Sequence, residues 1–322
     1  MSSGILVATD GRPGALGALR VARLLAQRRG SGVAVIAACE PTGLYPPGSP
    51  YAVPVPPPYD AAAALEALRS RVHAQLAELG SGAADWPISV EKGSAAATIA
   101  RAAVRQGAGL IVLGLRQPNA VERWLARETL LRLVHLADAP VLAVPERAAG
   151  LPRRAVLAVD FSEFSQRAAR RVIDTLAPGA RLYVAHATWT PVREDGSADH
   201  AGWTEWERSY RAGVERRLEE FTAKLGLPDD VSAEVQVLAG DPGTAILRLA
   251  DQVDADLIAA GSHGAGYFGR IVLGSVSGKL VHGSRCALLI APPRSIPEEL
   301  ALDLTEDELL ANLGMAGELT RS

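Results

Sequence analysis

The sequence has few of the features that mark secreted, membrane-spanning or nucleic-acid-binding proteins. Its 322 residues include two cysteines, Cys39 and Cys286, too far apart to suggest a disulfide framework. No uncharged apolar run approaches the ~18 residues that would span a membrane, and the first residues lack the basic region and cleavage site of a signal peptide. The net charge of −3 is too balanced for a dedicated nucleic-acid-binding protein. We therefore expect a cytoplasmic protein with neither a membrane nor a nucleic-acid partner.

Four segments of the first half of the chain reappear in the second half at a nearly constant spacing. Residues 5–10, 90–93, 110–114 and 141–145 match residues 156–160, 237–240, 257–261 and 288–292, with offsets of 150, 147, 147 and 147 residues. A repeat on this scale indicates a duplicated domain. The predicted domains are residues 1–149 and 150–294, followed by a tail of residues 295–322. In this tail seven acidic residues against one arginine leave a net charge of −6, and a capping box at Thr305 predicts a short helix.

Within each copy, short apolar runs alternate with stretches of helical periodicity. Continuous Val, Leu, Ile and Ala runs are typical of parallel strands buried on both faces. Helices are expected after Ser162, across residues 203–225 and across residues 246–253. The fold class predicted is α/β, with two tandem doubly wound domains, each a five-stranded parallel sheet with helices on both faces. A run of eight prolines between Pro41 and Asp60 excludes a helix or a central strand there.

The segment from Gly261 to Ser275 carries the strongest functional signal. Five glycines in fourteen residues stand between an apolar strand and a helix expected from Ser275. Glycines at such a junction let the backbone approach a ligand and adopt positive φ, and the helix N-terminus attracts an anion such as phosphate. Residues 264–269 match the G-x-G-x-x-G dinucleotide fingerprint, but they follow a fourth strand instead of a first. Gly278-Lys279 resembles the end of a P-loop. A P-loop would need glycine at position 273 and serine or threonine at position 280, and both positions are leucine.

The pattern Gly-x2-Gly-x9-Gly-Ser, together with the duplication, resembles the ATP-binding branch of the universal stress protein family. The resemblance covers both copies and is strongest at residues 156–163, 240–242 and 256–258. It implies the strand order 3-2-1-4-5, with Asp160 and the backbone near Ala187 at adenine or ribose and with the glycines at the phosphates. The switch point of such a sheet lies between the first and fourth strands, which Asp160 and Gly261 end. Asp160 has a second interpretation, as the N-cap of the helix after Ser162.

The cofactor implied is ATP, or ADP, AMP or cyclic AMP, with or without Mg²⁺. The predicted binding residues all lie in the second copy, on the turn after its first strand, at the end of its second strand, or between its fourth strand and the following helix. They are Asp160, Phe161, Ser162, Ala187, Gly261, Ser262, His263, Gly264, Gly266, Arg270, Gly274, Ser275, Val276 and Ser277.

The first copy departs from this pattern. It keeps Asp10 and Gly114, but Gln117, Arg127 and Glu128 replace Gly264, Gly274 and Ser275. Side chains then stand where the backbone should approach phosphate, and a carboxylate at Glu128 would repel an anion. We expect that the first copy does not bind ATP in the same way.

No catalytic or metal-binding set emerges from the sequence. The six histidines form no i, i+4 pair, Ser262 and His263 are sequence neighbours instead of a nucleophile and its base, and His186 is interpreted as a core or crevice residue. The resemblance implies a stress-response role with at most slow ATP hydrolysis, an unknown protein partner, and pairing through the fifth strands, within the chain or in a homodimer. Two alternatives stay open: an interaction module with a vacant site, working through residues 41–60 or the tail, and an adenylyl-transferring enzyme.

Overall fold

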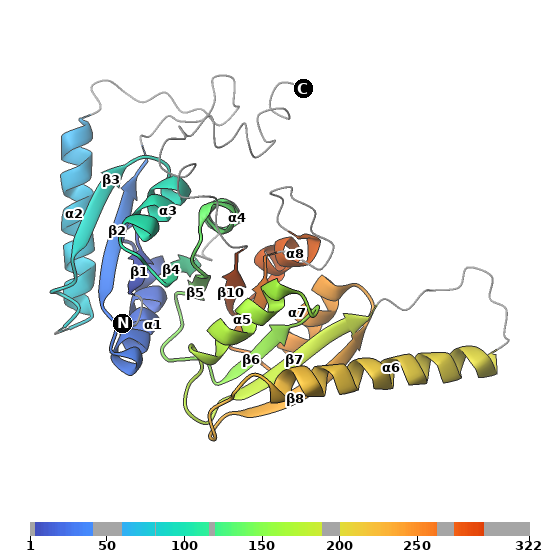
Figure 1. Ribbon diagram of the computed structural model, residues 1–322. Helices are drawn as coiled ribbons and strands as arrows, with labels where there is room; N and C mark the ends of the chain where they lie inside the picture. Colours follow the sequence, from blue (N-terminus) through green and yellow to red (C-terminus); the bar gives the residue numbers. More distant parts are fainter. Residues whose placement is uncertain are drawn as a thin grey trace, which may run out of the picture. The chain divides into compact units, whose positions relative to one another are not determined.

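The structure is a computed structural model that describes residues 4–40, 60–80, 82–115, 120–188, 200–262 and 274–292. The chain divides into two compact units that meet in the sequence between Gly150 and Leu151. Each unit is an α/β fold, coloured blue to green and green to red in Figure 1. The proline-rich segment 41–59 and the acidic tail lie outside the described residues, so the predictions made for them stay predictions.

Unit 1 has a parallel sheet in the order β3-β2-β1-β4-β5. The strands are β1 (Ile5–Ala8), β2 (Val33–Cys39), β3 (Ile88–Lys92), β4 (Leu110–Leu115) and β5 (Val141–Pro145). The helices are η1 (Pro13–Ala15), α1 (Leu16–Arg29), α2 (Ala61–Glu78), α3 (Ala95–Arg105) and α4 (Ala120–Leu136).

Unit 2 repeats this arrangement in the order β8-β7-β6-β9-β10, again with every described pair of neighbouring strands parallel. The strands are β6 (Arg154–Ala158), β7 (Arg181–Thr188), β8 (Ser232–Ala239), β9 (Leu257–Gly261) and β10 (Ala287–Ala291). The helices are α5 (Glu163–Ile173), α6 (His200–Ala223), α7 (Pro242–Gln252) and α8 (Ser275–Gly283). Numbered within each unit, both sheets follow the predicted order 3-2-1-4-5.

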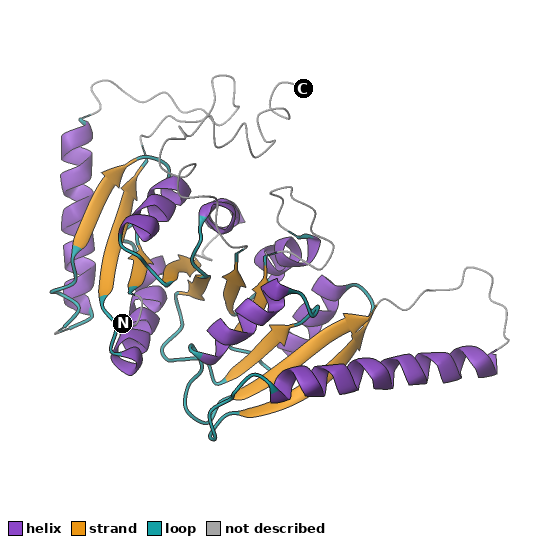
Figure 2. Cartoon of the chain, in the orientation of Figure 1, coloured by secondary structure: helices purple, strands orange, loops and turns teal. Residues whose placement is uncertain are grey.

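Most strand residues near the middle of the fold are apolar because helices cover both faces of each sheet. All four residues of β1 and all five of both β5 and β10 are buried. With right-handed crossovers, the first two helices of a unit cover one face and the last two cover the other; Figure 2 shows helices in front of and behind the sheet of unit 2. In this arrangement the first and fourth strands lead to opposite sides, so their carboxyl ends flank a crevice.

Local signals set the helix boundaries that border this crevice. Ser162 caps α5, its Oγ accepting a hydrogen bond from the Ser165 N–H at 3.3 Å. Asp241 caps α7 by accepting from the Thr244 N–H at 3.0 Å, and Pro242 fits the first turn. Helix α8 begins at Ser275, where the sequence predicts it, but Gly274 before it supplies no side-chain cap.

Candidate functional site

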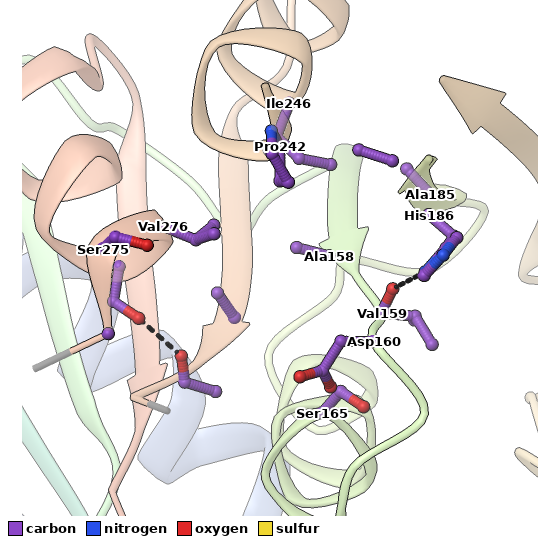
Figure 3. A pocket seen from close by; sticks show the side chains of 15 residues that line it. Ala158, Val159, Asp160, Ser165, Ala185, His186, Pro242, Ile246, Ser275 and Val276 are labelled. Atoms are coloured by element: carbon purple, nitrogen blue, oxygen red, sulfur yellow. Dashed lines mark hydrogen bonds between the residues drawn. The ribbon is translucent and has the colours of Figure 1, made fainter. Parts of the chain in front are cut away.

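Unit 2 contains a cavity of about 180 Å³ at the carboxyl ends of β6, β7 and β9 (Figure 3). Its walls come from these strand ends and from the first turns of α5, α7 and α8. The lining residues are Ala158, Val159, Asp160, Ser165, Ala185, His186, Ala187, Pro242, Ile246, Ala260, Gly261, Gly274, Ser275, Val276 and Ser277. Seven of the predicted site residues are therefore brought together: Asp160, Ala187, Gly261, Gly274, Ser275, Val276 and Ser277.

Asp160 organises the turn between β6 and α5. Its Oδ1 accepts hydrogen bonds from the Ser162 N–H at 3.0 Å and the Ser162 hydroxyl at 2.5 Å. The N-cap of α5 is thus Ser162 and not Asp160, which settles the second interpretation of the aspartate. The Asp160 Oδ2 accepts no hydrogen bond from the described residues and belongs to a side chain that lines the cavity. One oxygen therefore holds the turn and the other is left to a ligand.

Phe161 adopts a left-handed backbone conformation within this turn, with φ of +64°. Its ring lies 5.0 Å from the His186 ring and 6.3 Å from the Phe221 ring, and the Arg217 guanidinium carbon lies 4.2 Å above it. Phe161 and Ser162 are not cavity-lining residues. They shape the turn that carries Asp160, and their predicted binding role stays a prediction.

The end of β7 presents backbone groups to the cavity. The Val159 N–H donates to the Ala185 carbonyl at 2.8 Å, whereas the Thr188 carbonyl accepts from Gly240 on the β8 side. Backbone groups alternate between the two sides of a strand, so the N–H and C=O of Ala187 face the β6 side. Because β6 pairs with β7 only as far as Ala185, both groups lie beyond the end of β6, at the cavity.

His186 is tied to the same strand end, as the sequence interpretation of a crevice histidine expects. Its Nδ1 lies 2.6 Å from the Val159 carbonyl, a bond drawn as a dashed line in Figure 3. With a proton on Nδ1, the imidazole is a donor to Val159 and keeps an acceptor at Nε2.

The N-terminus of α8 opens onto the cavity. The first hydrogen bond within this helix runs from the Gly278 N–H to the Gly274 carbonyl at 3.0 Å. The N–H groups of Ser275, Val276 and Ser277 find no acceptor among the described residues, and such a first turn binds anions well. The Gly274 N–H donates to the Ser262 carbonyl at 2.9 Å, which fixes the position of this helix end.

Two of the glycines have structural features that the sequence analysis did not predict. Gly274 has φ of −57° and needs no glycine for its conformation, so the expected positive φ is wrong there. Gly261 is explained by packing, since a Cβ at this position would lie 2.5 Å from the Phe164 Cβ on α5. Gly114 of unit 1 is constrained in the same way, with an added Cβ 2.4 Å from the Gly14 carbonyl oxygen.

The two serines beside the glycines act as anchors. The Ser277 hydroxyl donates to the carbonyls of Gly261 at 2.8 Å and Ser262 at 3.1 Å, and so fastens α8 to the end of β9. Ser262 is fully buried and donates its N–H to Ala291. The other predicted phosphate contacts, His263, Gly264, Gly266 and Arg270, lie outside the described residues.

An ion pair joins the first turns of α7 and α8 beside the cavity. The Lys279 Nζ lies 2.8 Å from the Asp241 Oδ2, and this hydrogen bond, with two from Thr244, lowers the pKa of Asp241 to about 2. The pair is about half exposed on both sides. It holds together two elements that line the cavity, through Pro242 and Ile246 on α7 and Ser275 to Ser277 on α8.

Ser165, Pro242 and Ile246 are lining residues that the sequence interpretation did not include. The signal for Pro242 was present, because Gly240-Asp241-Pro242 resembles the third-strand turn of the family. Among the described residues no three His, Cys, Asp or Glu side chains group as metal ligands. No described helix is long and apolar enough to cross a membrane.

Unit 1 has a cavity of about 350 Å³ at the equivalent strand ends. Its lining includes Asp10, Arg12, Ala38, Glu40 and Thr129. Helix α4 already runs from Ala120, so Arg127 and Glu128 lie inside a helix, where backbone N–H groups bond within it. The expectation that the Glu128 carboxylate faces the anion position is wrong, because it accepts from Arg132 at 2.9 Å along the helix and does not line the cavity.

Comparison with known proteins agrees with the duplicated architecture. The model of the universal stress protein family matches residues 1–145 and again residues 152–292. A universal stress protein of Mycolicibacterium smegmatis is 30% identical over 210 residues, covering 64% of this chain and 68% of that protein. A universal stress protein from Thermus aquaticus is 34% identical over 136 residues, which cover 42% of this chain and 95% of that protein.

Among solved structures, a universal stress protein from Archaeoglobus fulgidus superposes with a TM-score of 0.62. The superposition covers 92% of this chain and 98% of that one at 20% identity, which supports the shared fold. Two family matches in succession, each over one five-stranded sheet, show that the chain belongs to the universal stress protein family and carries two such domains in tandem.

Proposed function

We propose that unit 2 binds ATP or a related adenine nucleotide, and that the protein acts in the stress response through this occupancy and through a protein partner. The observation that carries the proposal is the first turn of α8, whose N–H groups are uncapped by any described residue and face the same cavity as Asp160 and Ala187. This arrangement offers an anion site and a nucleoside site side by side.

The nucleoside end is assigned to the enclosed part of the cavity. The N–H and C=O of Ala187 supply one donor and one acceptor, which an adenine edge can use through its ring nitrogen and its amino group. The carboxylate of Asp160 has Oδ2 available to accept a hydrogen bond from a ribose hydroxyl. Apolar walls from Pro242 and Ile246 complete a surface against which a base can pack.

The phosphate end is assigned to the N-terminus of α8. Ser275 is exposed, so a phosphate chain can extend from the cavity toward solvent along the first turn of the helix. The helix dipole and the free N–H groups favour a negative charge there by about 0.3–1 kcal/mol, and by more where the site is partly buried. No described lysine or arginine lines the cavity, so phosphate recognition is assigned mainly to the backbone.

The test is a substitution that puts a negative charge into the anion site without harming the fold. Gly274 has the backbone conformation of an ordinary N-cap residue, with φ of −57° and ψ of 146°. Gly274→Asp should cap α8 with its own carboxylate, raising the free energy of unfolding by about a few tenths of a kcal/mol. The same carboxylate should repel phosphate, and ATP binding measured by isothermal titration calorimetry with Mg²⁺ should be lost.

Gly274→Ala is the matched control, because it adds a Cβ without adding a charge. It should keep most of the ATP affinity and remain folded by circular dichroism. Normal ATP binding by a folded Gly274→Asp protein would refute the assignment of the phosphates to α8.

A further inference from the structure

The cavity of unit 1 differs from that of unit 2 in its chemistry. It is about 350 Å³ in volume, within the range of small-molecule sites, against about 180 Å³ in unit 2. It keeps the strand edge and the aspartate but has a helix, α4, where unit 2 has the approach to its anion site. Its lining also includes Arg12 and Glu40, whereas no arginine or glutamate lines the cavity of unit 2.

The strand edge of unit 1 repeats that of unit 2. The Thr9 N–H donates to the Ile36 carbonyl at 3.0 Å, whereas the Cys39 carbonyl accepts from Gly93 on the β3 side. By the alternation of backbone groups, the N–H and C=O of Ala38 face the β1 side. Pairing of β1 with β2 ends at Ile36, so both groups of Ala38 lie at the cavity, which Ala38 lines.

Two carboxylates face this cavity. Asp10 Oδ1 accepts a hydrogen bond from the Arg12 N–H at 3.0 Å, and Oδ2 lies 3.7 Å from the Arg12 side chain in an ion pair that is about half exposed. Glu40 follows the end of β2. Its Oε1 accepts a hydrogen bond at 2.7 Å from the N–H of Ala95, which is the first residue of α3. The Glu40 carboxylate thereby occupies the N-terminus of a helix that borders the cavity, and it leaves Oε2 without a partner among the described residues.

The charges of these groups determine which ligand fits. Two carboxylates against one guanidinium give the cavity a negative balance, and the described helix α4 supplies Thr129 instead of an open first turn. Carboxylates are good acceptors for hydroxyl groups, whereas a phosphate near them is repelled. A ligand with a flat polar edge for Ala38 and hydroxyl donors for Asp10 and Glu40 matches all of these features.

We propose that unit 1 binds an uncharged nucleoside, and that it discriminates against the phosphorylated form. This inference goes beyond the nucleotide site proposed for unit 2. It rests on that proposal in one respect, namely that a base bonds to the backbone at the end of the second strand of a unit. The two units would then respond to two different states of the same kind of molecule, one with phosphates and one without.

The test uses a matched pair of substitutions that fill one cavity at a time. Ala38 and Ala187 hold equivalent, half-buried positions in the two units, and both side chains line their cavities. Ala187→Leu should abolish ATP binding to the full chain, while adenosine still binds. Adding Ala38→Leu to that protein should then abolish adenosine binding, with both proteins folded by circular dichroism. The single Ala38→Leu protein should bind ATP normally.

The preference for an uncharged ligand gives a second readout, which the cavity-filling substitutions alone would not provide. In the Ala187→Leu protein, adenosine should bind at least about tenfold more tightly than AMP, since two carboxylates oppose the phosphate. Glu40→Gln keeps an acceptor for the Ala95 N–H and removes the charge, so it should narrow this ratio severalfold.

Adenosine binding that disappears with Ala187→Leu alone, or that survives the double substitution, would overturn the inference. Equal affinity for adenosine and AMP in the Ala187→Leu protein would overturn it as well. Failure of the nucleotide site in unit 2 would be seen separately, as ATP binding that is absent from the natural protein or unchanged by Ala187→Leu.

Discussion

Phe161 offers a quantitative test of the turn that carries Asp160. A left-handed conformation costs a non-glycine residue roughly 1–2 kcal/mol, and Phe161 has φ of +64°. The equivalent residue of unit 1 is Gly11, with φ of +72°. We infer that the ring contacts of Phe161 compensate for the backbone strain that glycine avoids in unit 1.

The balance can be worked out from the contacts. An edge-to-face pair with Phe221 contributes about 0.5–1.5 kcal/mol, and an exposed cation–π contact with Arg217 about 0.5–1 kcal/mol. Both Phe161→Ala and Phe161→Gly lose these contacts, so both should be destabilised by about 1–2.5 kcal/mol before any change in strain. Only the glycine variant also recovers the strain, and it does so at a cost of about 0.4–1 kcal/mol in the entropy of the unfolded chain.

Phe161→Gly should therefore be more stable than Phe161→Ala by up to about 1.6 kcal/mol, and by about 0.8 kcal/mol at the centre of these ranges, the reverse of the usual ranking of alanine over glycine. Urea unfolding of the three proteins, followed by far-UV circular dichroism, measures this difference as a shift of the midpoint of the same transition. Gly11→Ala is the complementary variant and should be destabilising, because its Cβ would also lie 2.8 Å from the Arg71 Cβ. An alanine variant at 161 that equals or exceeds the glycine variant in stability would refute the strain argument.

Three further predictions concern stoichiometry, acid stability and glycine packing. Calorimetric titration with ATP and Mg²⁺ should give one site per chain, and a value near two would contradict the assignment of unit 1. Asp241 has a pKa of about 2, lowered by Lys279 and Thr244, so its ion pair stabilises the fold above pH ~4 and is lost as the pH falls toward 2. Asp241→Asn should accordingly be less stable than the natural protein at pH 7 by less than ~1 kcal/mol, because the pair is exposed, with the difference vanishing near pH 2 in acid-unfolding curves. Gly261→Ala and Gly114→Ala should each cost about 1–3 kcal/mol by overpacking, whereas Gly150→Ala, with open space around its Cβ, should change the unfolding midpoint little.

The fold could be predicted largely from the sequence because its signals are strong and repeated. The apolar run 257–261 becomes β9, which is buried except at Gly261, and the run 288–292 falls largely within the buried strand β10. The constant spacing of the repeat leaves little freedom in the architecture. Two helix starts were also predictable. Ser162 is a typical N-cap residue and precedes α5, and α8 begins at Ser275 directly after Gly274.

The site was predicted less completely because side-chain partners depend on elements far apart in the chain. Nothing near Phe161 in the sequence reveals that Arg217 and Phe221 of α6 pack on its ring. The role of Gly274 was also misjudged, since a glycine pattern cannot distinguish a positive φ from an uncapped helix start. Glu128 was misplaced because periodicity alone did not show that α4 begins as early as Ala120.

The packing of Gly261 changes what a glycine at this position signifies. In both units the fourth strand passes so close at this point to the segment after the first strand that a methyl group would collide, with Phe164 in one case and Gly14 in the other. A repeat that has lost its ligand would still need this glycine in order to fold. The first glycine of the motif is therefore a marker of architecture, and the retention of Gly114 in unit 1 carries no information about the ligand of that unit.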